Sequence, residues 1–139
     1  MQDRPSAREL LEAVEQFLER DVVSALEGPK QFHARVAANV MRILARELEL
    51  EPRFLRAEWQ RLNELLGGES AVDDALLRAA VTRRTRELCE RIRRGDADAQ
   101  PWRSRVLAHV RQTVEEKLAI AKPEMFSRSA LRNRPTGGS

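Results

Sequence analysis

Residues 32–50, Phe-His-Ala-Arg-Val-Ala-Ala-Asn-Val-Met-Arg-Ile-Leu-Ala-Arg-Glu-Leu-Glu-Leu, decide the fold class of this chain. Apolar residues recur in this stretch at steps of three and four, which is the spacing of one side of an α-helix. They stand at positions 36, 37, 40, 43, 44 and 48. We expect this apolar stripe to face a core, so the helix needs partner helices to cover it.

Local signals divide the rest of the chain into further helices. Ser6 followed by Glu9 is a capping-box pattern, which marks the start of a helix. Pro52 suits the first turn of a helix, because the amide hydrogen that proline lacks would have no partner there. We expect five helices, bounded by Ser6 and Gly28, Pro29 and Pro52, Pro52 and Gly67, Ser70 and Gly95, and Pro101 and Pro123.

Each of the other four helices carries an apolar stripe of its own, which we also expect to face the core. The stripes are Leu10, Leu11, Val14, Phe17 and Leu18; Leu55, Trp59, Leu62, Leu65 and Leu66; Leu76, Leu77, Ala80, Val81, Leu88 and Ile92; and Leu107, Val110, Val114, Leu118 and Ala121. No segment shows the period-two alternation of a strand. The sequence therefore predicts an all-α fold, a single compact bundle of four to five helices. Short connections favour antiparallel neighbours.

Composition sets the domain boundaries and the class of protein. A chain of 139 residues with 42% hydrophobic and 34% charged residues is typical of one soluble globular domain. We expect the bundle over residues 1–126 and a disordered basic tail over residues 127–139, where apolar residues are scarce. The net charge of +3 arises from Lys122 onward. The balanced body therefore argues against nucleic acid as a partner.

The chain has no apolar run of about 18 residues that could span a membrane, and its N-terminus lacks a signal peptide's apolar segment. We therefore expect a cytoplasmic protein. The single cysteine, Cys89, excludes an internal disulfide. Leu88 and Ile92 are its neighbours on the helix, so we expect Cys89 to be a small core residue.

Two helices carry the candidate residues for binding a ligand or partner. His33, Arg35, Asn39 and Arg42 belong to the second expected helix, and His109 belongs to the fifth. Two facing histidines could bind a metal, but the helical carboxylate pattern needs Glu-x-x-His twice. Positions 30 and 106 are Lys and Val. We therefore expect no metal and no cofactor, and we interpret each histidine as a core-edge residue hydrogen-bonded to a carbonyl.

Paired carboxylates raise the question of catalysis. Glu12 with Glu15, and Glu87 with Glu90, form Glu-x-x-Glu pairs. Helical nucleotide pyrophosphatases hold magnesium with such a pair and a later Glu-x-x-Asp, which this chain lacks. Nucleophile-elbow, glycine-loop and zinc-protease motifs are also absent. We therefore expect no catalytic residues and no enzymatic activity.

Arginines crowd the second half of the fourth helix and form the candidate phosphate site. Its members are Arg83, Arg84, Arg91 and Arg94. They could hold the phosphates of a nucleic acid or of coenzyme A. However, cations are favoured near a helix C-terminus anyway, and Glu87 and Glu90 allow ion pairs along the surface. No aromatic residue is interleaved, which argues against stacking on single strands.

Three segments resemble a family of small uncharacterised bacterial helical domains. They are Arg-Pro-Ser-Ala-Arg-Glu-Leu-Leu-Glu-Ala-Val-Glu-Gln-Phe-Leu from Arg4, Phe-His-Ala-Arg-Val-Ala-Ala-Asn from Phe32, and His-Val-Arg-Gln-Thr-Val-Glu-Glu-Lys-Leu-Ala-Ile-Ala-Lys-Pro from His109. Members tend to be encoded beside aminoglycoside-phosphotransferase-like kinases and acyl-CoA dehydrogenases. The resemblance implies an accessory role near acyl-CoA or phosphotransfer metabolism, and it supplies no catalytic residues.

Three hypotheses about function follow. The first is a non-catalytic helical module that contacts a partner enzyme or a second copy, which would cover Trp59 or Trp102 in a homodimer. The second is a binder of an acyl-CoA or phosphorylated ligand, with His33, Arg35 and Asn39 at one end of a pocket. The third is nucleic-acid binding through the arginines of the fourth helix and the tail.

Overall fold

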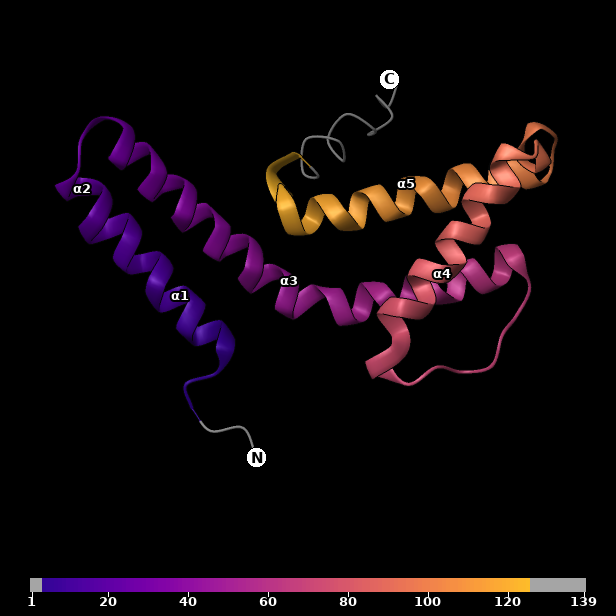
Figure 1. Cartoon of the computed structure of the whole chain (residues 1–139), viewed down its shortest axis with the longest axis horizontal. Coiled ribbons are helices and arrows are strands. Elements are labelled where there is room, and N and C mark those ends of the chain that lie inside the picture. The colour runs from indigo at the N-terminus through magenta and orange to yellow at the C-terminus, as the bar shows by residue number, and fades with distance from the viewer. Residues whose placement is uncertain (1–3, 126–139) are drawn as a thin grey trace, which may run out of the picture. The chain divides into compact units, whose positions relative to one another are not determined.

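The computed structural model describes residues 4–125, and every regular element among them is helical. The all-α prediction is thus confirmed. The order is α1 (Ala7–Phe17), a π-helical turn (Leu18–Val22), α2 (Val23–Ala25), α3 (Gly28–Leu66), α4 (Asp74–Arg93), a 3-10 turn (Asp96–Asp98) and α5 (Trp102–Ala121) (Figure 1). The expected tail over residues 127–139 lies outside the described residues. Within residues 4–125, no helix has the length and apolar character needed to cross a membrane.

The chain divides into two compact units, Met1–Glu51 and Pro52–Ser139, and the division falls inside α3. The prediction that one helix ends before Pro52 and another begins there was wrong, since α3 continues through this proline. A proline inside a helix removes one backbone hydrogen bond. The helical turns on both sides of Pro52 are long enough for the helix to continue despite that loss.

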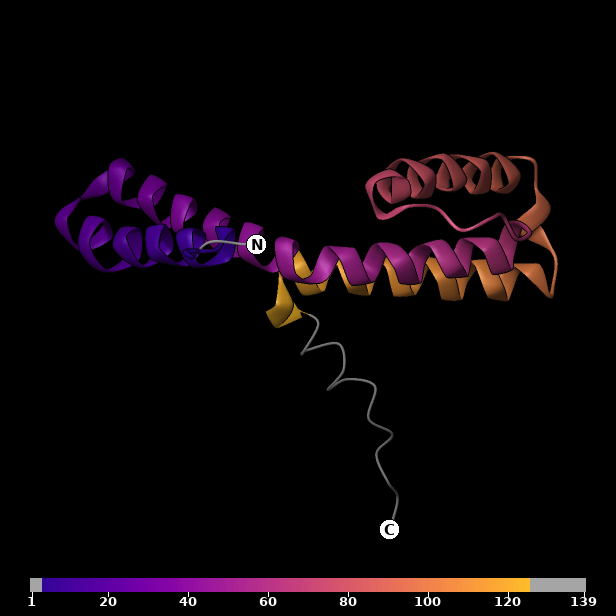
Figure 2. The ribbon, with the colours of Figure 1, turned by 90° about the horizontal axis from the view of Figure 1, so that it is seen from below.

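The first unit is a hairpin in which α1 runs beside the N-terminal part of α3 (Figures 1 and 2). The predicted capping box is confirmed at its start. The Ser6 amide donates to Glu9 Oε2 at 2.7 Å, and the Glu9 amide donates to Ser6 Oγ at 3.2 Å. These bonds lower the pKa of the Glu9 carboxyl. At the turn of the hairpin, Gly28 has a φ of 61°, which favours glycine.

Small residues line the seam of this hairpin. Ala34 and Ala38 are buried, and one helical turn separates them on α3. Val23 is the third buried apolar residue among the described residues of this unit. Short side chains let two helices approach closely, but they bury little apolar area.

Eight of the longer apolar side chains of the hairpin are exposed, which corrects part of the predicted core of both helices, whereas Leu11, Leu18 and Ile43 are half-buried. The exposed residues are Leu10, Val14 and Phe17 on α1, and Phe32, Val36, Val40, Leu44 and Leu48 on α3. A two-helix hairpin has one internal seam, so a stripe on any other side of either helix stays open. The periodicity identified amphipathic helices correctly. The prediction that these apolar residues face a core within the chain was wrong.

The second unit holds the main core of the described residues, built from the C-terminal part of α3, α4 and α5. Its buried residues are Trp59, Leu62, Leu65, Leu77, Val81, Leu88 and Val106. Trp102 packs against this core, and its Nε1 donates to the Leu65 carbonyl at 3.2 Å. The sequence led us to expect that a second copy would cover Trp59 or Trp102. Both tryptophans instead pack within this unit, so neither is available for such a contact.

The helix α4 runs in the same direction as the end of α3, although antiparallel neighbours were expected. Asp74 pairs with Arg56 at 2.6 Å, and Arg84, further along α4, donates to the Gly67 carbonyl at the end of α3. Residues 67–73 form the connection that returns to the start of α4 (Figure 1). Extended residues span about 3.3 Å each, so this connection is long enough for that return.

Parts of the predicted α4 stripe are also exposed. Leu76 and Ile92 lie on the surface, and so does Cys89. The prediction that Cys89 is a small core residue was wrong. Leu77, Val81 and Leu88 contact the core instead, so the buried side of α4 is narrower than the apolar stripe.

Candidate functional sites

The helix α5 exposes three apolar residues and buries a mixed side, on which Val106 is joined by two ionisable residues. Leu107, Val110 and Val114 are 58%, 44% and 50% exposed, although the sequence predicted that they face the core. His109 and Glu116 are buried instead, at 5% and 8% exposure. An ordinary surface helix has the opposite arrangement. The exposed residues Leu107, Val110 and Val114 are called the α5 stripe below.

An ion pair explains how Glu116 can be buried on the side of α5 that faces α3. Arg61 on α3 donates to both carboxylate oxygens of Glu116, at 2.9 and 2.8 Å. Gln112 Nε2 donates to the same carboxylate at 3.1 Å, and Thr113 Oγ1 accepts from Arg61 at 3.4 Å. A buried carboxylate is tolerated when such donors compensate its lost hydration. This polar cluster joins the C-terminal half of α5 to α3, while Val106 and Trp102 pack its N-terminal half against the core.

His109 lies next to this cluster. Burial lowers the pKa of its imidazole, and the positive charge of Arg61 lowers it further, while Glu116 acts in the opposite direction. His109 Nδ1 is buried and has no hydrogen-bond partner among the described residues. The expectation that a carbonyl bonds this histidine is therefore not met at Nδ1. Burial also raises the pKa of the neighbouring Glu58 carboxyl.

An open pocket of about 460 Å³ lies between α3 and α5 at this point. Its lining residues are Arg61, Glu64, Leu65, Arg105, Ala108, His109 and Gln112. Arg105 donates to the Glu64 carbonyl at 2.6 Å. The pocket therefore combines two guanidinium groups, an imidazole and an amide, with Glu64 and Glu116 balancing the charge of the arginines.

A second hollow of about 560 Å³ lies beside the α5 stripe. Its lining residues are Ile92, Ala97, Asp98, Arg103, Val106, Leu107 and Val110. Most of these side chains are apolar, and one acidic and one basic residue add charge. The hollow and the α5 stripe share Leu107 and Val110, so together they form one apolar surface with a groove.

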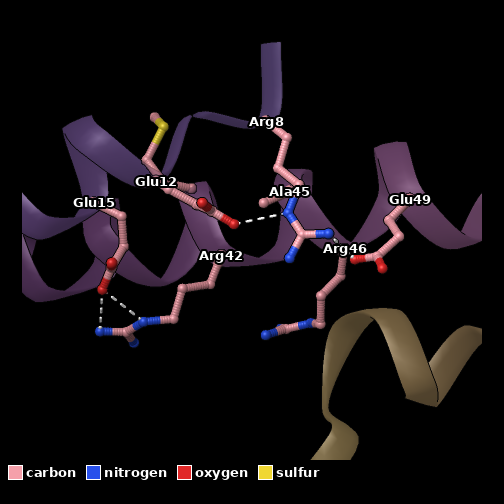
Figure 3. A pocket seen from close by; sticks show the side chains of 8 residues that line it. Arg8, Glu12, Glu15, Arg42, Ala45, Arg46 and Glu49 are labelled. Atoms are coloured by element: carbon pink, nitrogen blue, oxygen red, sulfur yellow. Dashed lines mark hydrogen bonds and ion pairs between the residues drawn. The ribbon is translucent and has the colours of Figure 1, made fainter. Parts of the chain in front are cut away.

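In the first unit, one side of the seam between α1 and α3 is charged. Arg8 pairs with Glu12 at 2.7 Å and with Glu49 at 2.6 Å. Arg42 pairs with Glu15 at 2.8 Å and with Glu19 at 3.1 Å. These six residues are called the charged row below. Figure 3 shows Arg8 pointing to Glu12 and Arg42 to Glu15.

A small pocket of about 180 Å³ lies along this charged row. Its lining residues are Arg8, Glu12, Glu15, Met41, Arg42, Ala45, Arg46 and Glu49. Acidic and basic groups are equal in number in this lining. Arg42, a candidate for binding a ligand or partner, is thus engaged in ion pairs within the hairpin.

The other candidates of this unit do not converge on one site. His33, Arg35 and Asn39 are exposed on α3. Their spacing places His33 on a different side of the helix from Arg35 and Asn39. The His33 ring contacts Phe32 edge-on, with centroids 5.7 Å apart. A pocket built from these three residues therefore receives no geometric support.

Arg84, a candidate for phosphate binding, is buried at 3% exposure. It donates to the Gly67 carbonyl, to Glu87 at 2.8 Å and to Glu69 at 3.2 Å. These bonds join α4 to the end of α3 and to the connection that follows it. Arg84 is therefore a structural residue, because its guanidinium is not accessible to a phosphate of a nucleic acid.

The other three arginines of this cluster lie in ion pairs. Arg83 pairs with Glu69 and lowers the pKa of that carboxyl. Arg91 donates to Asp96 at 3.0 Å and stacks over the Trp102 ring at 4.4 Å. Arg94 reaches the same aspartate at 3.4 Å. Phosphate binding at these residues stays a prediction, and the surface ion pairs anticipated from the sequence account for their positions.

The described residues contain no group of three or more His, Cys, Asp or Glu side chains placed to hold a metal ion. Three of the four Glu-x-x-Glu carboxylates form ion pairs with arginines. Glu12 and Glu15 join the charged row of the hairpin, and Glu87 pairs with Arg84.

Sequence reasoning missed the buried pair of Arg61 and Glu116, together with the α5 stripe. Arginine and glutamate at positions far apart in the chain carry no local signal of a contact. One signal did exist for α5. Trp102, Val106, His109 and Thr113 share a side of the helix, and a tryptophan on that side favours its burial.

Comparison with known protein families finds a match over most of the chain. The family described as a domain of unknown function, DUF6285, matches residues 24–125. This range contains α3, α4 and α5, while α1 precedes it. No curated protein and no solved structure matches the chain.

Proposed function

The chain belongs to the DUF6285 family, whose function is unknown, and we propose that it is a non-catalytic module that binds a partner protein through the α5 stripe. One observation carries this proposal. The helix α5 leaves Leu107, Val110 and Val114 exposed, while its other side is held to the core by Val106 and by the pairing of Glu116 with Arg61 on α3. Contiguous exposed apolar surface marks sites of protein association.

The shape of this surface indicates the kind of partner. The groove beside the α5 stripe is lined by Ile92, Ala97 and Leu107, and Asp98 and Arg103 contribute charges to it. A ridge and a groove of apolar side chains fit the apolar side of an amphipathic helix. We therefore propose an amphipathic helix of another protein as the ligand of this surface.

The resemblance described above supports a narrower form of the proposal. That resemblance implies that such domains tend to be encoded beside acyl-CoA dehydrogenases and phosphotransferase-like kinases. The partner would then be an enzyme of acyl-CoA or phosphotransfer metabolism, and this chain its accessory subunit.

Site-specific photo-crosslinking in the expressing cell tests the proposed surface. A photoreactive amino acid replaces Leu107 in one variant and Val114 in another. The matched control carries it at Ala108, which is exposed on another side of the same helix. We expect one protein to crosslink at the two stripe positions and not at the control.

The crosslinked protein is then purified and titrated against the chain. Leu107→Glu should weaken binding at least about tenfold, because it places a charge in an apolar contact. Equal crosslinking at all three positions, or none at Leu107 and Val114, would contradict the proposal. Unchanged affinity of the Leu107→Glu variant would also contradict it.

The pocket between α3 and α5 favours a second candidate function, the binding of a small polar ligand. Its specific support is His109, whose Nδ1 has no hydrogen-bond partner among the described residues and which lines that pocket. Coenzyme A and nucleotides are the probes, in a thermal-shift assay with His109→Asn as control. Stabilisation of the native chain that the variant loses would support this function, and no stabilisation would exclude it for these probes.

A further inference from the structure

The hairpin of the first unit has an apolar side that no residue of the seam covers. It consists of Leu10, Val14, Phe17, Phe32, Val36, Val40, Leu44 and Leu48, and is called the hairpin face below. Each of these eight side chains is between 39% and 63% exposed. Those on α3 follow one another at steps of four residues, which is a ridge along the helix.

The charged row fixes how the two helices contribute to this face. Arg8 on α1 pairs with Glu49 on α3, and Glu15 pairs with Arg42, so the helices are antiparallel and their register is known. Leu10 is therefore level with the end of the α3 ridge near Leu48. The helical repeat places the apolar ridges on a different side of each helix from the charges. Each helix therefore carries an exposed apolar ridge away from the charged row, and the two ridges together make up the hairpin face.

The fully buried core of the hairpin is small, although half-buried side chains such as Leu11, Leu18 and Ile43 add to it, so cover on this face supplies apolar burial that the seam lacks. Val23, Ala34 and Ala38 are its buried apolar residues within the described range, and two of them are alanines. Two isolated helices of this length bury too little area to offset the entropy of folding. Helical hairpins reach stability when further helices complete a bundle.

We propose that a second copy of this chain covers the hairpin face, so that two hairpins form an antiparallel four-helix bundle around a two-fold axis. The area of the face supports this occupant. Eight large side chains at these exposures present on the order of 700 Å² of surface per chain, and both copies contribute. The total, about 1,400 Å², lies within the usual range of stable interfaces.

The chemistry of the face also favours a second copy. None of its eight residues is charged, and the acids and bases beside the seam neutralise one another within the hairpin. Recognition then depends on apolar area and on the fit of ridges into grooves, which an identical face supplies. This inference is independent of the proposed function, since it concerns other residues and another partner.

Sedimentation velocity on the purified full chain, from about 1 to 100 µM, tests the second copy. The wild type should sediment as a dimer. Leu48→Glu should raise the dissociation constant at least about tenfold, equivalent to about 1.4 kcal/mol. The matched control is Leu107→Glu, since Leu107 is also an exposed leucine, at 58% compared with 53% for Leu48, but lies in the other unit. It should leave the dimer intact.

A milder variant guards against loss of the fold. Leu48→Ala should keep the helical circular dichroism signal at high concentration and still weaken the dimer. A wild type that is monomeric at every concentration would overturn the proposal. The cover of the hairpin face would then be another part of the chain or a different protein. Dissociation by Leu107→Glu as strong as by Leu48→Glu would overturn it as well. Crosslinking at the α5 stripe by a monomeric chain would still support the proposed function.

Discussion

Arg84 is the residue on which the junction of α3 and α4 depends most. It is buried, and it bonds the Gly67 carbonyl together with two carboxylates. Removing one member of a buried charged network leaves its partners unsatisfied. We expect Arg84→Ala to lower the free energy of unfolding by about 3 kcal/mol, measured by urea denaturation.

Arg83 provides the matched control, because it precedes Arg84 on α4 and pairs with the same Glu69. Its side chain is exposed, and exposed ion pairs contribute little. Arg83→Ala should leave the urea midpoint nearly unchanged. Equal losses in the two variants would mean that Arg84 acts as one more surface charge.

His109 should make the stability of the chain sensitive to mild acid. Its folded pKa is lowered mainly by burial, from an ordinary value of 6.5. Below that pH the unfolded chain binds a proton that the folded chain resists, so stability is lost as the pH falls from 7 through 6.5. Each unit of lowering corresponds to about 1.4 kcal/mol. His109→Asn should flatten the dependence of unfolding free energy on pH over this range.

The second histidine of the chain is the control for this experiment. His33 is exposed and lies in the other unit. His33→Asn should retain the loss of stability between pH 7 and pH 5.5. A profile that His109→Asn leaves as steep as that of the wild type would contradict the burial of this imidazole.

At the scale of the element, α5 is unusual in exposing the three apolar residues of the α5 stripe while it buries Glu116. We expect Leu107→Glu with Val114→Glu to leave the free energy of unfolding unchanged within about 0.5 kcal/mol, because both sites are exposed. Val106→Ala, one residue away but buried, should cost about 2 kcal/mol through lost contacts. Thermal and urea unfolding compare the variants, and a larger loss from the double substitution would contradict the orientation of α5.

Some ends of the helices could be predicted from the sequence, because their signals are local, but the fourth helix begins at Asp74 and not at Ser70 as expected. The capping box at Ser6 and the start of α5 at Trp102 stand where they were expected. Pro52 shows the limit of such signals. A proline is compatible both with the first turn of a helix and, at a cost, with its interior, and only the contacts around it decide between them.

Which side of a helix is covered could not be predicted. Hydrophobic periodicity identifies an apolar side, but not whether the same chain supplies the cover. Val40 and Leu107 therefore met every criterion of core residues and are exposed. Glu116 is the opposite case, a charged residue that is buried. Its burial depends on Arg61, which lies far from it in the chain.

At the scale of the whole molecule, the two units differ in how many apolar side chains they bury. The second unit buries a cluster built around Leu62, whereas the described part of the first unit buries three small or medium apolar residues. We expect the hairpin to be stable only in the dimer. Hydrogen exchange should show protection of α1 amides that increases with protein concentration, because dimerisation is linked to folding.

The protection of α4 and α5 amides is the internal control in the same experiment. It should stay constant over the same range of concentration, since the core of the second unit does not depend on a second hairpin. Protection of α1 that stays constant at high and low concentration would contradict this linkage.

The outward position of the α5 stripe is the claim on which the proposed function depends, and thiol labelling measures it most directly. In a Cys89→Ser background, Leu107→Cys and Val106→Cys each place one thiol on adjacent positions of α5. We predict that the cysteine at 107 reacts as fast as the exposed Cys89 of the native chain, and that the cysteine at 106 reacts at least about a hundredfold more slowly. Fast labelling at 106 with protection at 107 would show that the apolar side of α5 faces the core, and the account would fail.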